Sequence, residues 1–202
     1  MMLSELTAPG PDALPIAAFR DHLRMGSGFG ADDAAETAAL AGYLRAAIAT
    51  IEARTGKVLL SRRFRLKLSQ WRDDDVQMLP LAPVSRVERI ELSDAAGESR
   101  DYPTANWRLV EDTQRPWIAP TTGLLPMIDD GGSVTITFEA GFGAAWSDVP
   151  PELSQAVMLL AARYYEDRSF EGTASAIPFG VSALIERWRS VRLLGGRRKV
   201  RA

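Results

Sequence analysis

The sequence predicts an α+β protein, because the hydrophobic period changes twice along the chain. Residues 32–56 have apolar side chains at helical spacing, residues 63–140 contain runs that alternate between apolar and polar, and residues 150–168 return to helical spacing. Turn-forming glycine, proline and aspartate residues separate these runs. We therefore expect helices on both sides of a small antiparallel β region.

The N-terminal part is predicted to contain an arm followed by two helices. The prolines of residues 1–14 oppose helix formation, so this segment is expected to be an irregular arm. A short helix is predicted after Pro15, a residue that suits a first helical turn. A longer helix begins at Asp32 and ends at Gly56, which suits a left-handed cap. Its apolar face consists of Leu40, Leu44, Ala47, Ile48 and Ile51.

The β region is predicted over residues 58–140. Its clearest strands are residues 63–68 and 133–140, in which apolar and polar side chains alternate. The sequence Asp94-Ala-Ala-Gly97 is typical of a hairpin turn. Further strands are expected around Val76–Leu79, Val84–Leu92, Trp107–Leu109 and Ile118.

The C-terminal part returns to helix and ends in a basic tail. The helix that starts at Pro150 is apolar on nearly every side, so other elements or another subunit must cover it. A last short helix is expected between Val181 and Trp188. The predicted division is an arm at residues 1–14, a domain at 15–190 and a tail at 191–202. Within the domain we expect helices at 15–56, the β region at 58–140 and helices at 150–190.

Composition excludes several kinds of chemistry. The chain has 202 residues and a formal net charge of −2, so no overall electrostatic attraction to nucleic acid is expected. It contains no cysteine, which removes thiolate catalysis, disulfides and thiolate metal sites. No apolar run is long enough to span a bilayer, and the N-terminus lacks the features of a secretory signal. We therefore expect synthesis in a cytoplasm.

Three patterns suggest chemistry, and each has a more ordinary explanation. His22 is the only histidine, so a Ser/His/Asp site would need it, yet it is more typical of an amphipathic helix. Residues 26–31 match G-x-G-x-x-A, but a predicted helix precedes them instead of the strand that dinucleotide sites require, which favours a flexible connector. The run Asp73–Asp75 could hold a divalent cation, although such runs are more often solvated turns. We therefore predict no enzyme activity, no metal and no cofactor.

Two basic features are candidates for binding. Arg63, Arg65 and Lys67 form the outer face of a predicted strand, which suits a solvated face, a subunit interface or a channel-facing surface near DNA. The C-terminal segment mixes arginine with apolar residues, so a docking role competes with a disordered end. The candidate docking residues are Trp188, Arg189, Arg192, Leu193, Leu194, Arg197 and Arg198.

Several short motifs follow one another in a characteristic order. They are Ile51-Glu52…Thr55-Gly56-Lys57-Val-Leu59, then Leu79-Pro80-Leu-Ala-Pro83-Val84-Ser-Arg-Val87, then Phe138-Glu-Ala-Gly141-Phe-Gly143 with Asp148-Val-Pro150, and finally Tyr165-Glu166. Together they resemble the head–tail connector (adaptor) proteins of tailed bacteriophages and of phage-derived gene transfer agents. The resemblance extends over most of the chain and leaves out the proline-rich arm and the arginine-rich tail.

The resemblance implies a helical bundle assembled from the N- and C-terminal helices, with the small antiparallel β region inserted between them. It also implies a non-enzymatic protein, made in a bacterial cytoplasm, that forms a ring in the particle neck, usually of twelve copies, beneath the dodecameric portal. Such a ring extends the DNA channel without reading the DNA sequence, and it offers a platform to a tail-side stopper or terminator protein. In related adaptors a C-terminal segment docks on the portal, so the candidate docking residues are expected to contact it.

The residues alone also leave two other functions open. A nucleic-acid-binding protein would use the basic tail on phosphates, and its DNA binding would fall steeply with added salt. A small hydrolase built on His22 would lose its activity on His22→Ala. A connector is expected to bind free DNA weakly at most and to need no membrane.

Overall fold

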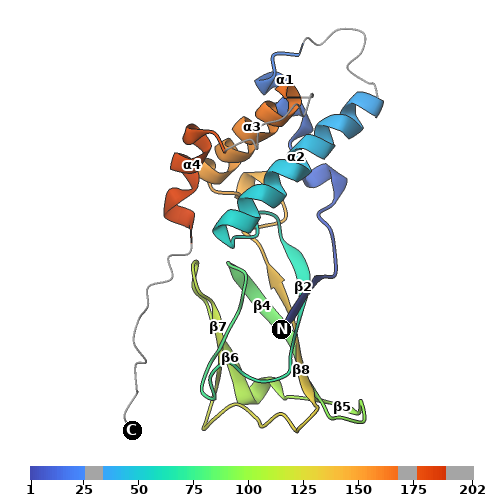
Figure 1. Cartoon of the computed structure of the whole chain (residues 1–202), viewed down its shortest axis with the longest axis vertical. Coiled ribbons are helices and arrows are strands. Elements are labelled where there is room, and N and C mark those ends of the chain that lie inside the picture. The colour runs from blue at the N-terminus through green and yellow to red at the C-terminus, as the bar shows by residue number, and fades with distance from the viewer. Residues whose placement is uncertain (26–33, 168–176, 190–202) are drawn as a thin grey trace.

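The protein consists of two bodies stacked along its longest axis (Figure 1). The computed structural model describes residues 1–25, 34–167 and 177–189. Within those residues, four α-helices lie at one end and two antiparallel sheets lie at the other. Each body has its own cluster of buried hydrophobic side chains.

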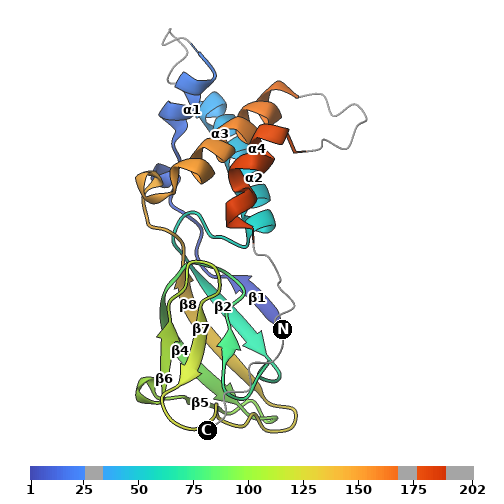
Figure 2. The same ribbon diagram turned by 90° about the vertical axis from the view of Figure 1, so that its left-hand side faces the viewer.

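The helical body is a layer with α3 (Pro151–Glu166) at its centre. On its two sides α3 contacts α2 (Ala34–Thr55) and α4 (Phe179–Ile185), which lie on opposite flanks of the layer (Figures 1 and 2). The short helix α1 (Ile16–His22) contacts α2 and α3 and buries Phe19 completely. The helices α1, α2 and α4 together cover α3, whose side chains are apolar on nearly every side.

The larger sheet has five antiparallel strands in the order β1-β2-β8-β4-β5. The strands are β1 (Met2–Glu5), β2 (Arg62–Leu68), β4 (Val84–Ser93), β5 (Ser99–Asp101) and β8 (Ser133–Ala140). One face is buried: Phe64 lies opposite Phe138 and Leu66 opposite Ile136 in the register of β2 and β8. The other face carries polar and charged side chains, as the alternating pattern predicted.

A second, three-stranded sheet covers the buried face of the first. Its strands β3 (Gln77–Met78), β7 (Trp117–Pro120) and β6 (Trp107–Val110) pair in the order β3-β7-β6. The side chains of Ile118 and Trp107 belong to the same buried cluster as the apolar face of the larger sheet. Figure 2 shows β6 and β7 in front of β8 and β4. The β body is therefore a two-layer structure with a core of its own.

The predicted helical bundle with a small inserted β region is wrong. The described part of the protein is a mixed α/β structure in which a five-stranded and a three-stranded antiparallel sheet form a separate body beneath the helices (Figure 1). Part of the larger sheet comes from the segment expected to be an irregular arm, because Met2–Glu5 pairs with β2 as an edge strand. Strands of two to four residues, such as β3 and β7, are too short to display a period, so their contribution could not be weighed from the sequence.

Two predicted glycine positions are confirmed by their backbone conformations. Gly56 has a φ of 68° and ends α2, and Gly97 has a φ of 87° in the turn between β4 and β5. Residues 26–31, with their dinucleotide-like pattern, lie outside the described residues. In the described part of the chain, no helix is both long and apolar enough to cross a membrane. The division into arm, domain and tail stays a prediction.

Candidate assembly surfaces

The first three sequence motifs meet at the junction between the two bodies, whereas Tyr165 of the last motif lies at the other end of α3 and packs against Tyr43 of α2. The first motif ends α2 and starts the connection to β2: Glu52 accepts a hydrogen bond from the Leu59 amide at 2.8 Å and one from Arg62 at 2.6 Å. Burial raises the pKa of the Glu52 carboxyl, and the positive charge of Arg62 opposes that rise. This carboxylate therefore ties the end of a helix to the start of a strand.

The glycine motif after β8 forms the other half of the junction. The Ser61 amide donates to the Gly143 carbonyl at 2.8 Å, and the Gly141 amide donates to the Pro83 carbonyl at 3.0 Å. Gly141 has a φ of 139°, and a Cβ there would lie 2.5 Å from the Cα of Ser61. A side chain at Gly143 would collide with Asp148, whose carboxylate accepts a hydrogen bond from the Ala145 amide at 2.9 Å. These residues serve close backbone packing and the chain's entry into α3.

A buried lysine lies in the same region. Lys57 is fully buried, and its amine has no hydrogen-bond partner among the described residues. Burial lowers the pKa of the Lys57 amine, while the negative charge of Asp112 acts in the opposite direction. The sequence analysis did not single out this position, although its place between Gly56 and the apolar run Val58–Leu60 was a weak signal of burial.

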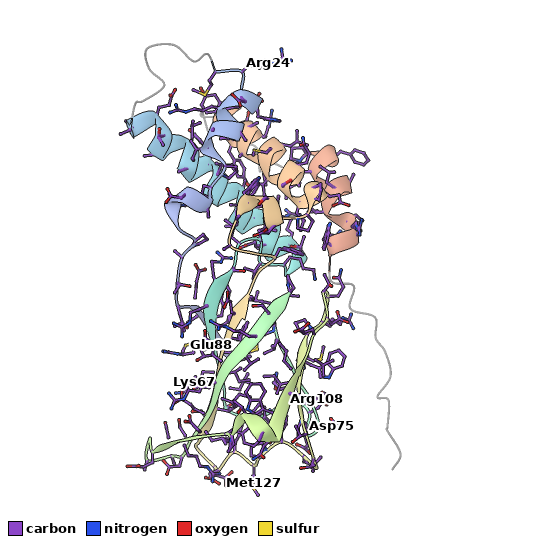
Figure 3. The ribbon with its side chains drawn as sticks, turned by 180° about the vertical axis from the view of Figure 1, so that it is seen from behind. Arg24, Lys67, Asp75, Glu88, Arg108 and Met127 are labelled. Carbon is purple, nitrogen blue, oxygen red and sulfur yellow. The ribbon has the colours of Figure 1, made fainter. Side chains whose placement is uncertain are left out.

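The residues considered for catalysis or metal binding lie in different bodies of the protein and do not form one site. His22 is exposed at the end of α1 in the helical body. Asp73–Asp75 are exposed in the turn between β2 and β3, and Figure 3 shows Asp75 in the β body. Across residues 1–25, 34–167 and 177–189, no group of three His, Asp or Glu side chains could hold a metal ion.

The outer face of the larger sheet carries alternating charges. Arg63 is bonded to Glu88, with its Nε 3.0 Å from a carboxylate oxygen, and Arg86 contacts Glu139 at 3.0 Å. The hydrogen bond that Arg63 donates to Glu88 raises the pKa of the Arg63 guanidinium. Arg89 likewise pairs with Asp101 at 2.6 Å. Figure 3 shows Glu88 and Lys67 on this side of the molecule. The basic strand is thus partly neutralised by the neighbouring strand β4.

Arg65 and Lys67 complete the basic row predicted on β2. Both side chains are exposed, and opposite them in β8 stand Thr137 and Thr135. An interface or channel-facing role for Arg63, Arg65 and Lys67 stays a prediction.

The described chain ends after the first two candidate docking residues, Trp188 and Arg189. Trp188 is 8% exposed and packs edge-on against Phe142, with ring centroids 5.5 Å apart. Arg189 is exposed and contacts Glu186 at 3.1 Å. The structure therefore places Trp188 in the helical core beside the junction. The other candidates, Arg192, Leu193, Leu194, Arg197 and Arg198, lie outside the described residues.

Large apolar side chains remain exposed at three places in the described chain. Met1 and Met2 lie at the edge strand β1. Leu124 and Met127 lie in the loop between β7 and β8, and Figure 3 shows Met127 at the end of the molecule opposite Arg24. Phe179, the first residue of α4, is 88% exposed. Such side chains are candidates for contacts with other proteins.

Comparison with known proteins identifies the chain's relatives. No protein-family model matches it, and no curated protein does. Three solved chains match 98% of this chain and 100% of their own length. One, from the neck of an empty gene transfer agent particle computed with C6 symmetry, is 60% identical with a TM-score of 0.88. One from the virion of a native gene transfer agent particle is 59% identical with a TM-score of 0.85.

The third, from the neck of a native gene transfer agent particle computed with C12 symmetry, is 55% identical over 98% of this chain, with a TM-score of 0.83. Identity at this level over the full length of both chains confirms the resemblance found in the short motifs. The chain therefore belongs to the family of structural proteins found in the neck of gene transfer agent particles.

Proposed function

We propose that this protein is the head–tail adaptor of a gene transfer agent particle. In this proposal its copies form a ring beneath the portal, extend the DNA channel and offer a platform to a tail-side stopper or terminator protein. The observation that carries the proposal is the full-length similarity to chains from particle necks. Those necks were computed with C6 and C12 symmetry, and a ring of twelve copies is compatible with both.

The described surface supports a role in assembly. Its shared motifs hold two bodies in one arrangement, and its exposed apolar residues lie at the periphery, at β1, at the β7–β8 loop and at α4. The outer sheet face pairs Arg63, Arg86 and Arg89 with carboxylates, which weakens any attraction to phosphates. This pairing speaks against phosphate binding by the sheet face, so the nucleic-acid-binding alternative would depend on the basic tail.

The portal contact is proposed for the segment that starts at Arg189. Packing of Trp188 against Phe142 fixes the point at which this segment leaves the helical body. The segment from Arg192 to Arg198 contains several arginines, a residue type enriched in binding hot spots, together with the apolar side chains of Leu193 and Leu194. Trp188 then acts as an anchor for the docking segment, and its own contact with the portal would require release from Phe142.

Deletion of residues 190–202 tests the proposal. The full-length and shortened chains are produced in cells that make gene transfer agent particles and lack the native gene. Purified particles are examined for the protein by immunoblotting and for attached tails by electron microscopy. We expect the full-length chain in the neck of tailed particles. We expect the shortened chain to melt at the same temperature as the full-length chain, yet to be missing from heads, which stay tailless.

Two results separate the parts of the proposal. Normal incorporation of the shortened chain would show that the tail does not make the portal contact. Tailed particles without the full-length chain would overturn the adaptor function itself. A charge-matched control, Arg197→Lys with Arg198→Lys, keeps both positive charges. It is expected to assemble normally if the portal contact depends on charge alone. DNA binding by the purified chain is measured at low and moderate salt, and tight, salt-sensitive binding would favour the alternative function.

A further inference from the structure

We infer that neighbouring copies of this chain pack head to tail, with Phe179 of one copy inserted into a pocket beside α2 of the next. This inference rests on the proposed ring, and it names the surfaces that close that ring. A knob and a hole of matching chemistry lie on opposite flanks of the helical body.

The knob is Phe179 at the start of α4. Its side chain is 88% exposed, the largest exposed fraction among the large hydrophobic residues of the described chain. Ala183 and Glu186 follow on the same face of the helix and the turn after it, at spacings of four and seven residues, and both are exposed. An isolated exposed phenylalanine is common on protein surfaces. The exposure of Phe179 therefore supports a contact only together with a complementary pocket.

The hole is a pocket of about 400 Å³ between α2 and the N-terminal segment. Ala8, Pro9, Leu14, Ile48 and Ala49 provide its apolar walls. This volume accommodates one aromatic side chain, and the apolar walls match an aromatic ring in polarity. The pocket is preformed, since Leu14 and Ile48 are themselves buried members of the helical core.

A buried arginine in the pocket favours an aromatic occupant over an anion. The side chain of Arg62 is only 10% exposed, and its Nε has no hydrogen-bond partner in the described part of the chain. Two carboxylates, Glu52 and Glu5, already neutralise its charge at 2.6 Å and 3.4 Å. An additional anion would meet both carboxylates, whereas an aromatic ring can pack on the guanidinium face. One aromatic ring already does so, since Phe64 lies 5.5 Å from the Cζ of Arg62.

The positions of knob and hole fit a closed ring. The pocket lies on α2 and Phe179 on α4, with α3 between the two helices (Figures 1 and 2). Complementary patches on opposite flanks produce a head-to-tail contact, which closes into a ring when the rotation per copy allows it. A patch that recognised itself would instead give a two-fold dimer. The arrangement within one chain therefore matches the rotational symmetry of the relatives' necks.

The surroundings of the pocket favour a helix as the neighbour. One face of α2 beside the pocket carries exposed alanine and glycine residues, which lets another helix approach closely: Ala38, Gly42, Ala46, Ala49 and Ala53. Arg45 is exposed on the rim of the pocket.

Cysteine cross-linking tests the contact inside particles. The chain has no cysteine of its own, so introduced thiols report only on the chosen pair. The double variant Ala49→Cys with Phe179→Cys is incorporated into particles and treated with a short bismaleimide linker. We expect a ladder of covalent multimers on denaturing gels, and no ladder from either single variant. A second pair, Gly42→Cys with Ala183→Cys, probes the same helix contact without touching the knob or the pocket.

The outcomes separate this inference from the ring itself. Particles that contain the variants but show no multimers from either pair would overturn the contact and leave the adaptor function standing. Multimers from Phe179→Cys alone would indicate a two-fold contact and also overturn it. A cross-link to a protein of another mass would assign Phe179 to a different neck component. Absence of the unmodified chain from necks would instead refute the proposed function.

An aromatic-to-alanine substitution gives an independent measure. Phe179→Ala is expected to lower the amount of the chain in particle necks by about tenfold or more, as for a buried aromatic anchor. Gln114→Ala, which truncates an exposed side chain in the turn between β6 and β7 of the β body, serves as the control. Both variants are expected to have the same melting temperature as the wild-type protein. Equal incorporation of Phe179→Ala and the wild-type chain would contradict the inference.

Discussion

Replacing Gly141 by alanine should destabilise the whole protein, because this glycine holds the two bodies together. Its φ of 139° is a backbone conformation that residues with a side chain rarely adopt. A Cβ there would lie 2.5 Å from the Ser61 Cα and N atoms and 2.7 Å from the Leu60 carbonyl carbon. Ordinary Cβ contacts begin at 3.4 Å, so the Ser61 backbone would have to move by about 0.9 Å (3.4 − 2.5).

The magnitude follows from the two costs. Holding a side-chain-bearing residue in a strained conformation costs about 1–3 kcal/mol. Overpacking adds about 1–3 kcal/mol, because the movement works against the hydrogen bond from the Ser61 amide to Gly143. We therefore expect a loss of roughly 4 kcal/mol, which corresponds to a fall in melting temperature of roughly 8–16 °C for a protein of this size.

Thermal unfolding followed by the fluorescence of the five tryptophans measures this loss. Gly97→Ala separates the two costs, because Gly97 also has a positive φ but has no atom within 4 Å of the added Cβ. Gly42→Ala controls for the substitution itself, since this site in α2 is open and alanine should stabilise the helix by up to about 1 kcal/mol. A Gly141→Ala protein that melts within about 2 °C of wild type would refute the reasoning.

Two further substitutions test side chains of the junction and the helical core by the same thermal unfolding. Lys57→Met should stabilise the protein by about 1–3 kcal/mol, because it removes a buried amine for which the described residues provide no hydrogen-bond partner. The pKa of Lys57 is lowered in the folded state, so the stability of the wild-type protein rises as pH approaches the unfolded value of 10.5. The stability advantage of Lys57→Met over the wild-type protein should therefore shrink toward that pH. An advantage that grows with pH would contradict the assignment. Trp188→Ala should cost about 3–5 kcal/mol, because it empties a core site next to Phe142, whereas Arg189→Ala should change little. Equal melting temperatures for these two variants would show that Trp188 is not part of the core.

The functional family was predictable because its signal lies in short motifs. Gly56, Gly141 and Gly143 are required by local backbone geometry, and Glu52 by the capping of the next segment. Such requirements act within a few residues, so they leave a recognisable order of residue types along the chain. Only the structure showed that the first three motifs meet in space, where they form the junction between helices and sheets.

The candidate site was predicted only in part. Trp188 was expected to mark the last short helix and to contact the portal; the structure buries it against Phe142, and the portal contact stays a prediction. The basic strand was found, but its pairing with Glu88 on β4 was not, since 25 residues separate Arg63 from Glu88. The pocket beside α2 left no trace in the sequence. Its walls come from the N-terminal segment and from α2, and no local pattern reports that they meet.

The sequence by itself determined the local structure of this protein: the helical faces of α2 and α3, the alternation of β2 and β8, and the glycine turns. These features depend on the spacing of apolar side chains and on backbone freedom, both of which are set by residues close together in the sequence. The tertiary structure alone decided that Met2–Glu5 joins the larger sheet, that a second sheet covers it, and that Lys57 is buried. It also placed Phe179 and the α2 pocket on opposite flanks. Each of these depends on contacts between residues distant in sequence, where burial in a shared core overrides local preference.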